Sequence, residues 1–384
     1  MTIKVWDYLT EYDRDRDAIL AAVDRVFQSG KLILGPHVRQ FEDSFAAYCG
    51  VAHGIGVDNG TNALLIALKA LGVEPGSEVI TVPNTAVPTV SAIVAAGAVP
   101  RFVDIDRRTY LMNLDLLEEA ITKRTSCIIP VHLFGQCVPM TDVRRIAAAH
   151  GIQVLEDCSQ SHGATQDGRT CGSMSDIAAF SLYPTKTLGA YGDGGIIITN
   201  RDDLDARVRR LRFYGMDGFG TGDPGVREAK FAYYAIEHGY NSRLDEVQAA
   251  ILLIKLAHLD ADIARRQTVA RRYDETLKST SLVLPATLPA NAHVYYLYVA
   301  RHQERDRILA EMAAHDVLLN VSYPCPIHLM PAYTDLGYHE GDFPEAEQAA
   351  REIFSLPMYP ALTAGQQDIV CRALGRVLTE PVAV

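Results

Sequence analysis

The chain has 384 residues, of which 48% are hydrophobic and 22% charged, so it can bury a large core, and its length suits two domains better than one. Its formal net charge of -11 argues against a nucleic-acid partner, because affinity for a phosphate backbone depends on clustered Lys and Arg. No apolar run approaches the roughly 20 residues that span a bilayer, and the first residues lack the layout of a signal peptide, so we expect a cytoplasmic protein without a membrane partner.

The cysteines and arginines indicate neither a metal site nor a polyanion site. The seven cysteines never form a C-x-x-C pair of the kind that binds zinc or carries redox chemistry, so we interpret them as structural thiols and predict no metal. Arginines cluster within residues 209–212 and again within residues 265–272. Either cluster could bind a small anion, but solvated helix faces are the simpler interpretation.

From about Gly54 to Asn200, short β-rich runs alternate with segments of helical periodicity, a pattern typical of a mostly parallel sheet flanked by helices. Strands are predicted at 78–83, 99–103, 126–133, 153–157, 177–182 and 195–199. Helices are predicted at 61–71, 88–96 and 141–150, each followed by a glycine that can end it. Several of the strands are continuously apolar, as strands buried on both faces should be. This part of the chain is therefore predicted to be an α/β domain.

The second half of the chain has a different pattern. A glycine-rich stretch at 218–225 is predicted to be a surface loop. Beyond it we predict, in order, a long helical stretch at 243–277, an alternating strand at 293–299, and helices at 305–315 and 345–354. We place a large domain with an N-terminal helical segment at residues 1–264 and a smaller C-terminal α+β domain at residues 265–384.

One lysine occupies a position where ligands commonly bind. The segment SLYPTKTLGAYGDGG (181–195) places Lys186 just after a buried strand, in a glycine-rich loop. In open α/β sheets, ligands bind outside the carboxyl ends of the strands. A buried lysine amine can react with an aldehyde to form a covalent link, which an arginine cannot do. A plain surface loop is the competing interpretation of a lysine considered alone.

Two carboxylates, Glu156 and Asp157, end the apolar run at 152–155. A carboxylate in this place can keep the ring nitrogen of pyridoxal phosphate (PLP) protonated, which the chemistry of that cofactor requires. We assign this role to Asp157. Helix capping or a surface salt bridge would be the better interpretation if Lys186 were not expected on a neighbouring strand.

A third segment, DNGTNAL (58–64), opens a helix directly after an apolar run. The amide groups and positive dipole end of such a helix suit a phosphate. Gly60 lets the backbone approach closely, and Thr61 and Ser181 can add hydroxyl groups. An ordinary helix N-cap explains this segment equally well when it is taken by itself.

Together, these segments resemble the DegT/DnrJ/EryC1/StrS aminotransferases, which are PLP enzymes of fold type I, over nearly the whole chain. The SLYPTKTLGAYGDGG block is the most specific part of the resemblance. It implies that Lys186 binds the cofactor covalently, that Asp157 holds the pyridine nitrogen, and that Gln160 lies beside the cofactor ring. The α/β domain is then expected to have the aspartate-aminotransferase-like fold.

The resemblance also implies a composite phosphate site. Gly60, Thr61 and Ser181 match phosphate-binding positions of the family. The segment GYNSRLDEVQAA (239–250) resembles the family stretch whose asparagine, here Asn241, reaches the phosphate of the partner subunit's cofactor. We therefore expect a homodimer.

The substrate side departs from the family in one place. In PNTAVPTVSAI (83–93), many relatives carry an aromatic residue that stacks on the PLP ring, where this chain has Ala86. A small side chain still covers the ring face, so cofactor binding should survive. The segment SYPCPIHL (322–329) follows the family, which implies that Tyr323 and His328 contact the substrate, and Tyr183 is a further candidate. Core packing is the alternative for all three.

The predicted reaction consists of two half-reactions. An amino donor, expected to be glutamate as in the family, converts PLP to pyridoxamine phosphate, and a keto sugar then accepts the nitrogen. The expected acceptor is a nucleotide-linked keto-6-deoxy sugar, aminated at C3 or C4. Keto-cyclitols, free keto sugar acids and a PLP-binding protein without transaminase activity remain alternatives. An NAD-linked enzyme would need G-x-G-x-x-G directly after the first strand, with an acidic residue about 20 positions on, and we do not find that pattern. Dehydratases related to the family replace the lysine with histidine, so Lys186 favours transamination.

Overall fold

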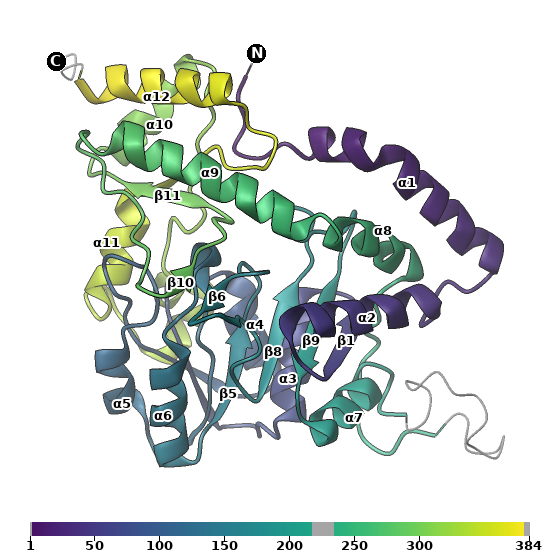
Figure 1. Cartoon of the computed structure of the whole chain (residues 1–384). Helices are drawn as coiled ribbons and strands as arrows, with labels where there is room; N and C mark the ends of the chain where they lie inside the picture. The colour runs from purple at the N-terminus through teal and green to yellow at the C-terminus, as the bar shows by residue number, and fades with distance from the viewer. Residues whose placement is uncertain (1, 217–233, 380–384) are drawn as a thin grey trace.

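A seven-stranded sheet organises the larger part of the computed structural model, which describes residues 2–216 and 234–379 (Figure 1). In spatial order its strands are β1 (His53–Val57), β9 (Gly195–Thr199), β8 (Ile177–Ser181), β5 (Gln153–Asp157), β4 (Thr125–Ile128), β2 (Glu78–Thr81) and β3 (Val99–Phe102). The loop predicted at 218–225 lies outside the described residues.

The direction of the strands confirms the predicted mostly parallel sheet. β2 pairs in parallel with β3 and β4, β4 with β5, and β5 with β8. β9 pairs antiparallel with both β8 and β1, so within this sheet it alone runs against the other strands. β8 and β9 are buried almost throughout, which explains their unbroken apolar sequences.

Helices lie on both sides of the sheet; in the view of Figure 1, α2 lies in front of it and α3 and α4 behind. The helices are α1 (Tyr8–Ser29), α2 (Pro36–Cys49), α3 (Gly60–Ala70), α4 (Val87–Ala95), α5 (Leu117–Ala120), α6 (Met140–His150), α7 (Asp202–Leu211), α8 (Glu246–Leu256), α9 (Leu259–Leu277), α10 (Arg305–Ala314), α11 (Pro344–Glu352) and α12 (Ala364–Thr379). The helices predicted from about residues 61, 88 and 141 are thus confirmed to within one residue. No helix in the described parts of the chain has the length and apolar character needed to cross a membrane.

The C-terminal part has a hydrophobic cluster of its own, to which α9, α10 and α12 contribute. It includes the antiparallel pair β11 (Tyr298–Arg301) and β12 (Ile353–Leu356). Ile3 from the start of the chain also belongs to it, and its amide donates to the Asp316 carbonyl oxygen at 2.8 Å. A small third sheet joins β10 (Asn291–Ala292), β6 (Thr165–Gln166) and β7 (Arg169–Thr170). The boundary proposed after residue 264 falls inside α9 and stays a prediction.

Two predicted elements of the C-terminal half differ in the structure. The helical stretch at 243–277 is divided between α8 and α9. The alternating strand at 293–299 is wrong for most of its length, since β11 begins only at Tyr298. Tyr295 has a positive φ of 50°, and the buried Arg266 side chain donates to the carbonyl oxygens of Tyr295 and Met358. The segment therefore wraps around a buried guanidinium group and does not extend.

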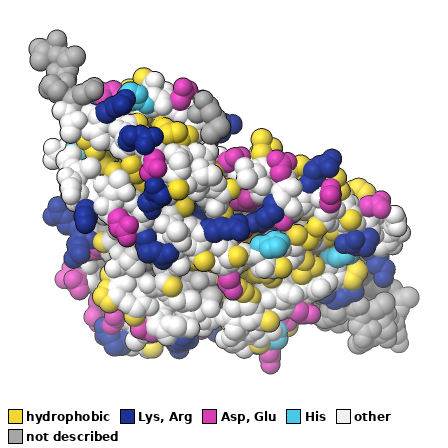
Figure 2. Space-filling view, turned by 45° about the horizontal axis from the view of Figure 1, so that its top comes forward, with side chains coloured by type: hydrophobic (Ala, Val, Ile, Leu, Met, Phe, Trp, Pro, Cys, Tyr) yellow, Lys and Arg dark blue, Asp and Glu magenta, His cyan; other side chains and the backbone are white. Residues whose placement is uncertain are grey.

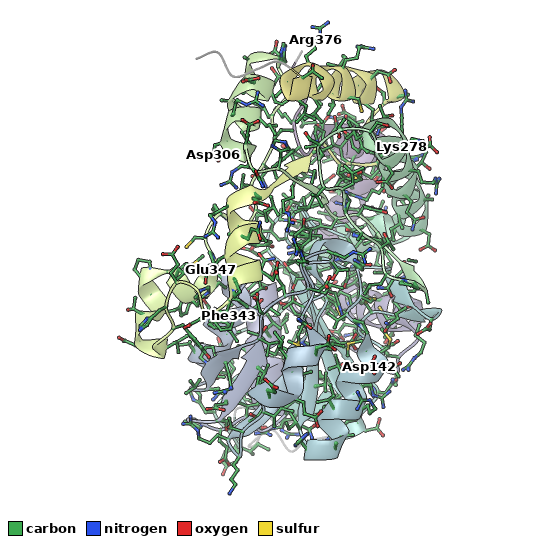
Figure 3. All side chains as sticks on the ribbon, turned by 90° about the vertical axis from the view of Figure 1, so that its left-hand side faces the viewer. Asp142, Lys278, Asp306, Phe343, Glu347 and Arg376 are labelled. Atoms are coloured by element: carbon green, nitrogen blue, oxygen red, sulfur yellow. A yellow bond between two sulfur atoms is a disulfide. The ribbon has the colours of Figure 1, made fainter. Side chains whose placement is uncertain are left out.

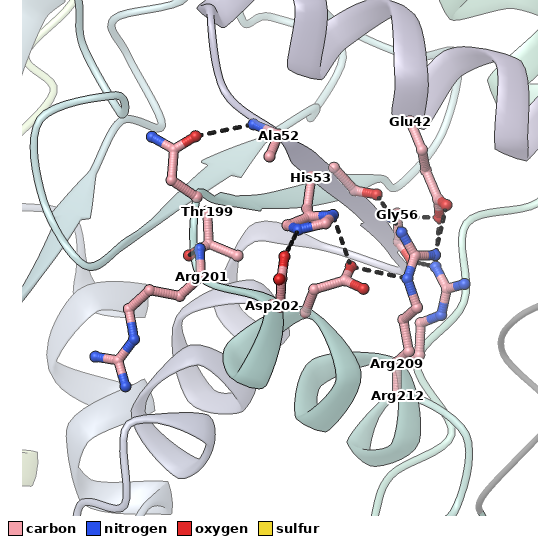
Figure 4. A network of polar contacts seen from close by, with 12 residues as sticks. Glu42, Ala52, His53, Gly56, Thr199, Arg201, Asp202, Arg209 and Arg212 are labelled. Carbon is pink, nitrogen blue, oxygen red and sulfur yellow. Dashed lines mark hydrogen bonds and ion pairs between the residues drawn. The ribbon is translucent and has the colours of Figure 1, made fainter.

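The first arginine cluster is largely internal. Arg209 and Arg212, at the end of α7, both form ion pairs with the buried carboxylate of Glu42 from α2 (Figure 4). Burial alone would raise the pKa of Glu42, but Arg212 and Arg209 lower it below its ordinary value. The Glu42 carboxylate also accepts a hydrogen bond from the Gly56 amide at 2.8 Å. These two arginines thus hold α2, β1 and α7 together. The simpler interpretation, that they lie on a solvated helix face, is therefore wrong for both of them.

The cysteines also depart from the expectation of structural thiols alone. Cys137 and Cys171 form a disulfide, which connects the loop before α6 to the segment after β7. The other five cysteines are free, and Cys325 is the only one of them that is not buried.

Candidate active site

The carboxyl ends of several strands meet at one edge of the large sheet and enclose a cavity of about 270 Å³. β5 and β8 are adjacent and parallel, so their last residues, Asp157 and Ser181, reach the same edge. Eight residues predicted from the sequence line this cavity: Gly60, Thr61, Ala86, Asp157, Gln160, Ser181, Tyr183 and Lys186. Segments that are far apart in the sequence therefore converge on one site.

Lys186 lies in the loop that follows β8. Its backbone amide donates to the Tyr183 carbonyl oxygen at 2.8 Å, which closes a turn and directs the lysine to the cavity. The ammonium group lies 4.7 Å from the centroid of the Tyr296 ring, a cation–π contact. The Tyr296 hydroxyl is within 3.2 Å of the Thr185 hydroxyl. Tyr296 was missed in the sequence, where it looked like part of a strand.

Asp157 is 3% exposed and its carboxylate is held from two sides. One oxygen accepts the Ser159 amide at 3.1 Å, and the other accepts the Thr89 hydroxyl from α4 at 2.8 Å. Thr89 lines the cavity but was not predicted, because nothing in its local sequence distinguishes it from a helix-start threonine. The carboxylate keeps acceptor capacity for one more donor inside the cavity.

Glu156 faces away from the cavity, as the alternation of side chains along a strand requires. Its buried carboxylate accepts from the amides of Gly172 and Met174 and from the Ser175 hydroxyl, at 2.8–3.0 Å. It also accepts from Nε2 of His132 at 2.9 Å, since the other ring nitrogen accepts the Val138 amide. These donors overcome burial, which alone would raise the pKa of Glu156, and lower it below its ordinary value. Glu156 is therefore fully occupied within the fold.

The start of α3 forms a narrow cradle at the same cavity. The Asn59 side chain caps the helix by accepting the Asn62 amide at 2.8 Å. A Cβ atom on Gly60 would lie 2.6 Å from Cβ of Ser181, so only glycine allows the helix to approach the end of β8 this closely. The first amides of a helix have no partner within it, and here they sit beside the Ser181 and Thr61 hydroxyl groups. This arrangement suits a phosphate.

Gln160 is fixed in one orientation. Its side-chain oxygen accepts the Phe134 amide at 2.8 Å, and its side-chain nitrogen donates to the Tyr323 hydroxyl at 2.6 Å. Phe134 has a φ of 60°, unusual for a residue other than glycine, and its ring stacks on Tyr323. Burial raises the pKa of Tyr323, so its phenol stays protonated. Tyr323 thus touches a cavity residue although it does not line the cavity itself.

Besides Tyr323, two further predicted site residues do not line this cavity. His328 is 1% exposed, with Nε2 3.1 Å from the Glu347 carboxylate and its ring against Phe343. Figure 3 labels these two partners, which lie within α11 and just before it. His328 occupies the packed position that was the alternative in the sequence. Asn241 is exposed and does not line the cavity of its own chain.

The cavity fits PLP in each of its parts. A lysine amine can bind the aldehyde, a buried carboxylate can hold the ring nitrogen, and the cradle at α3 and Ser181 can bind the phosphate. Ala86 lies at the wall of the cavity and leaves room for the ring.

Comparison with known proteins agrees with this geometry. A model of the DegT/DnrJ/EryC1/StrS aminotransferase family matches residues 13–375. The dTDP-3-amino-3,4,6-trideoxy-alpha-D-glucose transaminase of Micromonospora megalomicea subsp. nigra is 51% identical over 99% of this chain and 100% of its own length. The structure of S. venezuelae DesV in complex with a ketimine intermediate is 38% identical, with a TM-score of 0.94 over 99% of both chains.

The cofactor follows from the same comparison. The structure of NtdA from Bacillus subtilis, with the bound cofactor PMP, is 31% identical and has a TM-score of 0.86 over 96% of this chain and 82% of its own. These likenesses confirm the fold and the enzyme class expected from the sequence. The chain belongs to the DegT/DnrJ/EryC1/StrS aminotransferase family, and it is an aminotransferase that uses pyridoxal phosphate.

Proposed function

We propose that this enzyme transfers an amino group from glutamate to C3 of a nucleotide-linked 3-keto-6-deoxy sugar. The observation that supports the sugar class is the 51% identity, over essentially the whole length of both chains, with a transaminase named for a dTDP-linked 3-amino sugar. The cavity supports the reaction class, because it joins Lys186, Asp157 and a phosphate cradle within one enclosure.

Each cavity residue then has one task. Bound PLP supplies an aldehyde that takes up the amino group and a ring that withdraws electrons from the reacting carbon. Gly60, Thr61 and Ser181 hold the phosphate, and Asp157 keeps the proton on the ring nitrogen. Nζ of Lys186 removes the proton from the amine-bearing carbon of the donor and returns one to the acceptor carbon in the second half-reaction.

The mouth of the cavity suits a sugar. The side chain of Tyr183 lines the cavity and is 52% exposed, so one face of its ring is available to a substrate that enters from solvent. We assign Tyr183 to the sugar side of the site. Tyr323 acts on the site through Gln160, which it holds in place, whereas His328 has a structural role beside Glu347.

We also propose that the working unit is a homodimer in which Asn241 completes the phosphate site of the partner. Asn241 is exposed, and the residues near it include Tyr234 and Ile236, whose large side chains are more than half exposed. Further hydrophobic side chains are exposed, among them Leu9 and Phe27 of α1. Figure 2 shows hydrophobic side chains at the surface on the right-hand half of the molecule. A two-fold interface would bury such side chains and bring Asn241 to a second cavity.

A panel of acceptors tests the proposed substrate. Glutamate first converts the enzyme to its pyridoxamine phosphate form, and each keto compound is then added while the visible absorbance of PLP is followed. The nucleotide-linked 3-keto-6-deoxy sugar should restore the absorbance fastest. Faster recovery with a 4-keto sugar, a keto-cyclitol or a free keto sugar acid would refute the proposed acceptor without affecting the enzyme class.

Subunit mixing tests the composite site. Lys186→Ala and Asn241→Asp variants, each inactive or weakened alone, should regain activity when mixed, since one site of each heterodimer then carries neither change. Absence of recovery after confirmed subunit exchange, or full activity of a monomer, would contradict the proposal.

A further inference from the structure

We propose that two buried threonines, Thr89 and Thr85, are positioning residues that hold the Asp157 carboxylate against the cofactor ring. The inference rests on the proposed role of Asp157. Thr89 is 1% exposed and lies in the first turn of α4, with its hydroxyl 2.8 Å from one carboxylate oxygen of Asp157. The Thr85 hydroxyl, also buried, is 3.0 Å from that of Thr89.

The carboxylate decides the direction of both hydrogen bonds. An ionised carboxylate only accepts, so Thr89 must give its single hydroxyl proton to Asp157. The oxygen of Thr89 is then left to accept, and Thr85 must be its donor. The result is a directed chain from Thr85 through Thr89 to Asp157, in a place where the burial of all three side chains keeps water from competing.

This chain fixes the plane of the carboxylate. Thr89 holds one oxygen at 2.8 Å, and the Ser159 amide holds the other at 3.1 Å. A carboxylate anchored at both oxygens cannot rotate about its Cβ–Cγ bond without losing one anchor. Its remaining acceptor sites therefore keep a constant direction toward the cavity.

The same chain also connects the two sides of the proposed ring site. Thr85 and Thr89 flank Ala86, the residue expected to cover the ring face, and all three line the cavity. The Thr89 amide donates to the Ala86 carbonyl oxygen at 3.1 Å, so the start of α4 is a rigid turn. The hydroxyl chain thus ties the residue over the ring to the residue at the ring nitrogen.

The test compares Thr89→Val, which keeps the shape but removes the hydroxyl, with Thr89→Ser, which keeps the hydroxyl. The readouts are the PLP dissociation constant of the apo-enzyme, the absorption spectrum of the bound cofactor and its pH dependence, and kcat. Because a hydrogen bond to a charged group is at stake, Thr89→Val should weaken PLP binding and lower kcat by about tenfold or more. Thr89→Ser should stay within about threefold of the wild-type enzyme.

Thr85→Val tests whether Thr85 acts on Asp157 through the hydroxyl of Thr89. Alone, it should shift the cofactor spectrum in the same direction as Thr89→Val and have a smaller effect on binding. In the Thr89→Val background it should have no further effect, since Thr85 acts through Thr89. Equal effects of Thr85→Val in the wild-type and Thr89→Val backgrounds would refute the proposal that Thr85 acts through Thr89. This comparison uses melting temperatures as a control for general loss of structure.

The outcomes separate this inference from the proposed function. If Asp157→Asn impairs the enzyme but Thr89→Val leaves PLP binding, spectrum and kcat unchanged, the positioning role is wrong and the function of Asp157 stands. If Asp157→Asn itself has no effect, the proposed role of Asp157 fails first. Should Thr89→Val not fold, Thr85→Val decides the question, and an unchanged cofactor spectrum in that variant would overturn the inference.

Discussion

Glu156 and Asp157 are consecutive carboxylates at the end of β5, yet the structure gives them opposite surroundings. Glu156 faces the protein interior, where four donors from two segments occupy its two oxygens. Asp157 faces the cavity with two donors, and its other acceptor sites are open. A carboxylate whose capacity is filled stabilises the fold, whereas one with spare capacity, held rigid at a cavity, is available for a ligand. The experiments below use this difference.

The largest effect is expected at the cavity itself. Lys186→Ala removes both the covalent link to PLP and the proposed proton carrier, so turnover should fall by about a thousandfold or more. Borohydride treatment followed by peptide mapping should find the reduced cofactor on Lys186 in the wild-type enzyme and on no residue in the variant. Lys255→Ala is the control, because Lys255 is also buried but lies beside Glu11. Cofactor mapped to Lys255 would refute the assignment.

Asp157→Asn should give the next largest effect. The change keeps the shape and removes the charge that stabilises the protonated ring nitrogen, so kcat should fall by about a hundredfold or more while PLP still binds. Stability should change little, since the asparagine oxygen still accepts one of the two existing hydrogen bonds. Near-normal turnover in steady-state assays would move the role to another group.

Glu156→Gln should show the reverse pattern. An amide nitrogen in place of either oxygen would face donors that now point at a carboxylate, and the buried pair with His132 would lose its charge. We expect a loss of about 3 kcal/mol in the free energy of unfolding, measured with urea. Turnover per folded molecule should remain within a few-fold of the wild-type value. A variant that is stable but inactive would reverse the comparison between the two carboxylates.

The smallest expected effect concerns pH. Burial, together with the nearby positive charge of Lys186, lowers the pKa of His162 to about 3. The unfolded chain binds a proton near pH 6.5 and the folded protein does not, so stability falls as the pH drops below 6.5. Between pH 6.5 and 5, the contribution of His162 to this loss should be about 1.5 kcal/mol.

Replacing His162 with Phe should remove that contribution. The ring already packs between Phe45 and Phe180, so a phenyl group fits the surroundings. Urea unfolding at the two pH values should show a shallower loss in the variant, while His293, whose pKa burial also lowers to about 3, still contributes in both proteins. Equal losses in the two proteins would mean that His162 is already protonated in the fold.

The sheet and most of the cavity could be predicted because their signals are local. Continuous apolar runs mark β5 and β8, and Lys186 and Asp157 follow directly from where these strands end. β1 was missed, since its sequence HGIGV is short and interrupted by glycine. When a local pattern places residues at the carboxyl ends of neighbouring parallel strands, the sheet brings those residues to the same edge.

The remaining features depend on long-range contacts. Thr89 and Tyr296 acquire their importance from partners distant in sequence, and no local pattern distinguishes them. His328 looked like a substrate residue from its motif, but Glu347 and Phe343 hold it elsewhere. The strand predicted at 293–299 failed for the same reason, because a buried arginine from α9 determines the path of the backbone.

The contact between Gly60 and Ser181 also bears on the local stability of the first turn of α3. The two residues come from distant parts of the chain, and no side chain separates them. A phosphate bound there would stabilise the first turn of α3, because this turn could not unfold without releasing the phosphate. Amide hydrogens in this turn should then exchange with solvent far more slowly in the holo-enzyme than in the apo-enzyme. Loss of the cofactor should therefore cause local unfolding at the start of α3 before it destabilises the sheet.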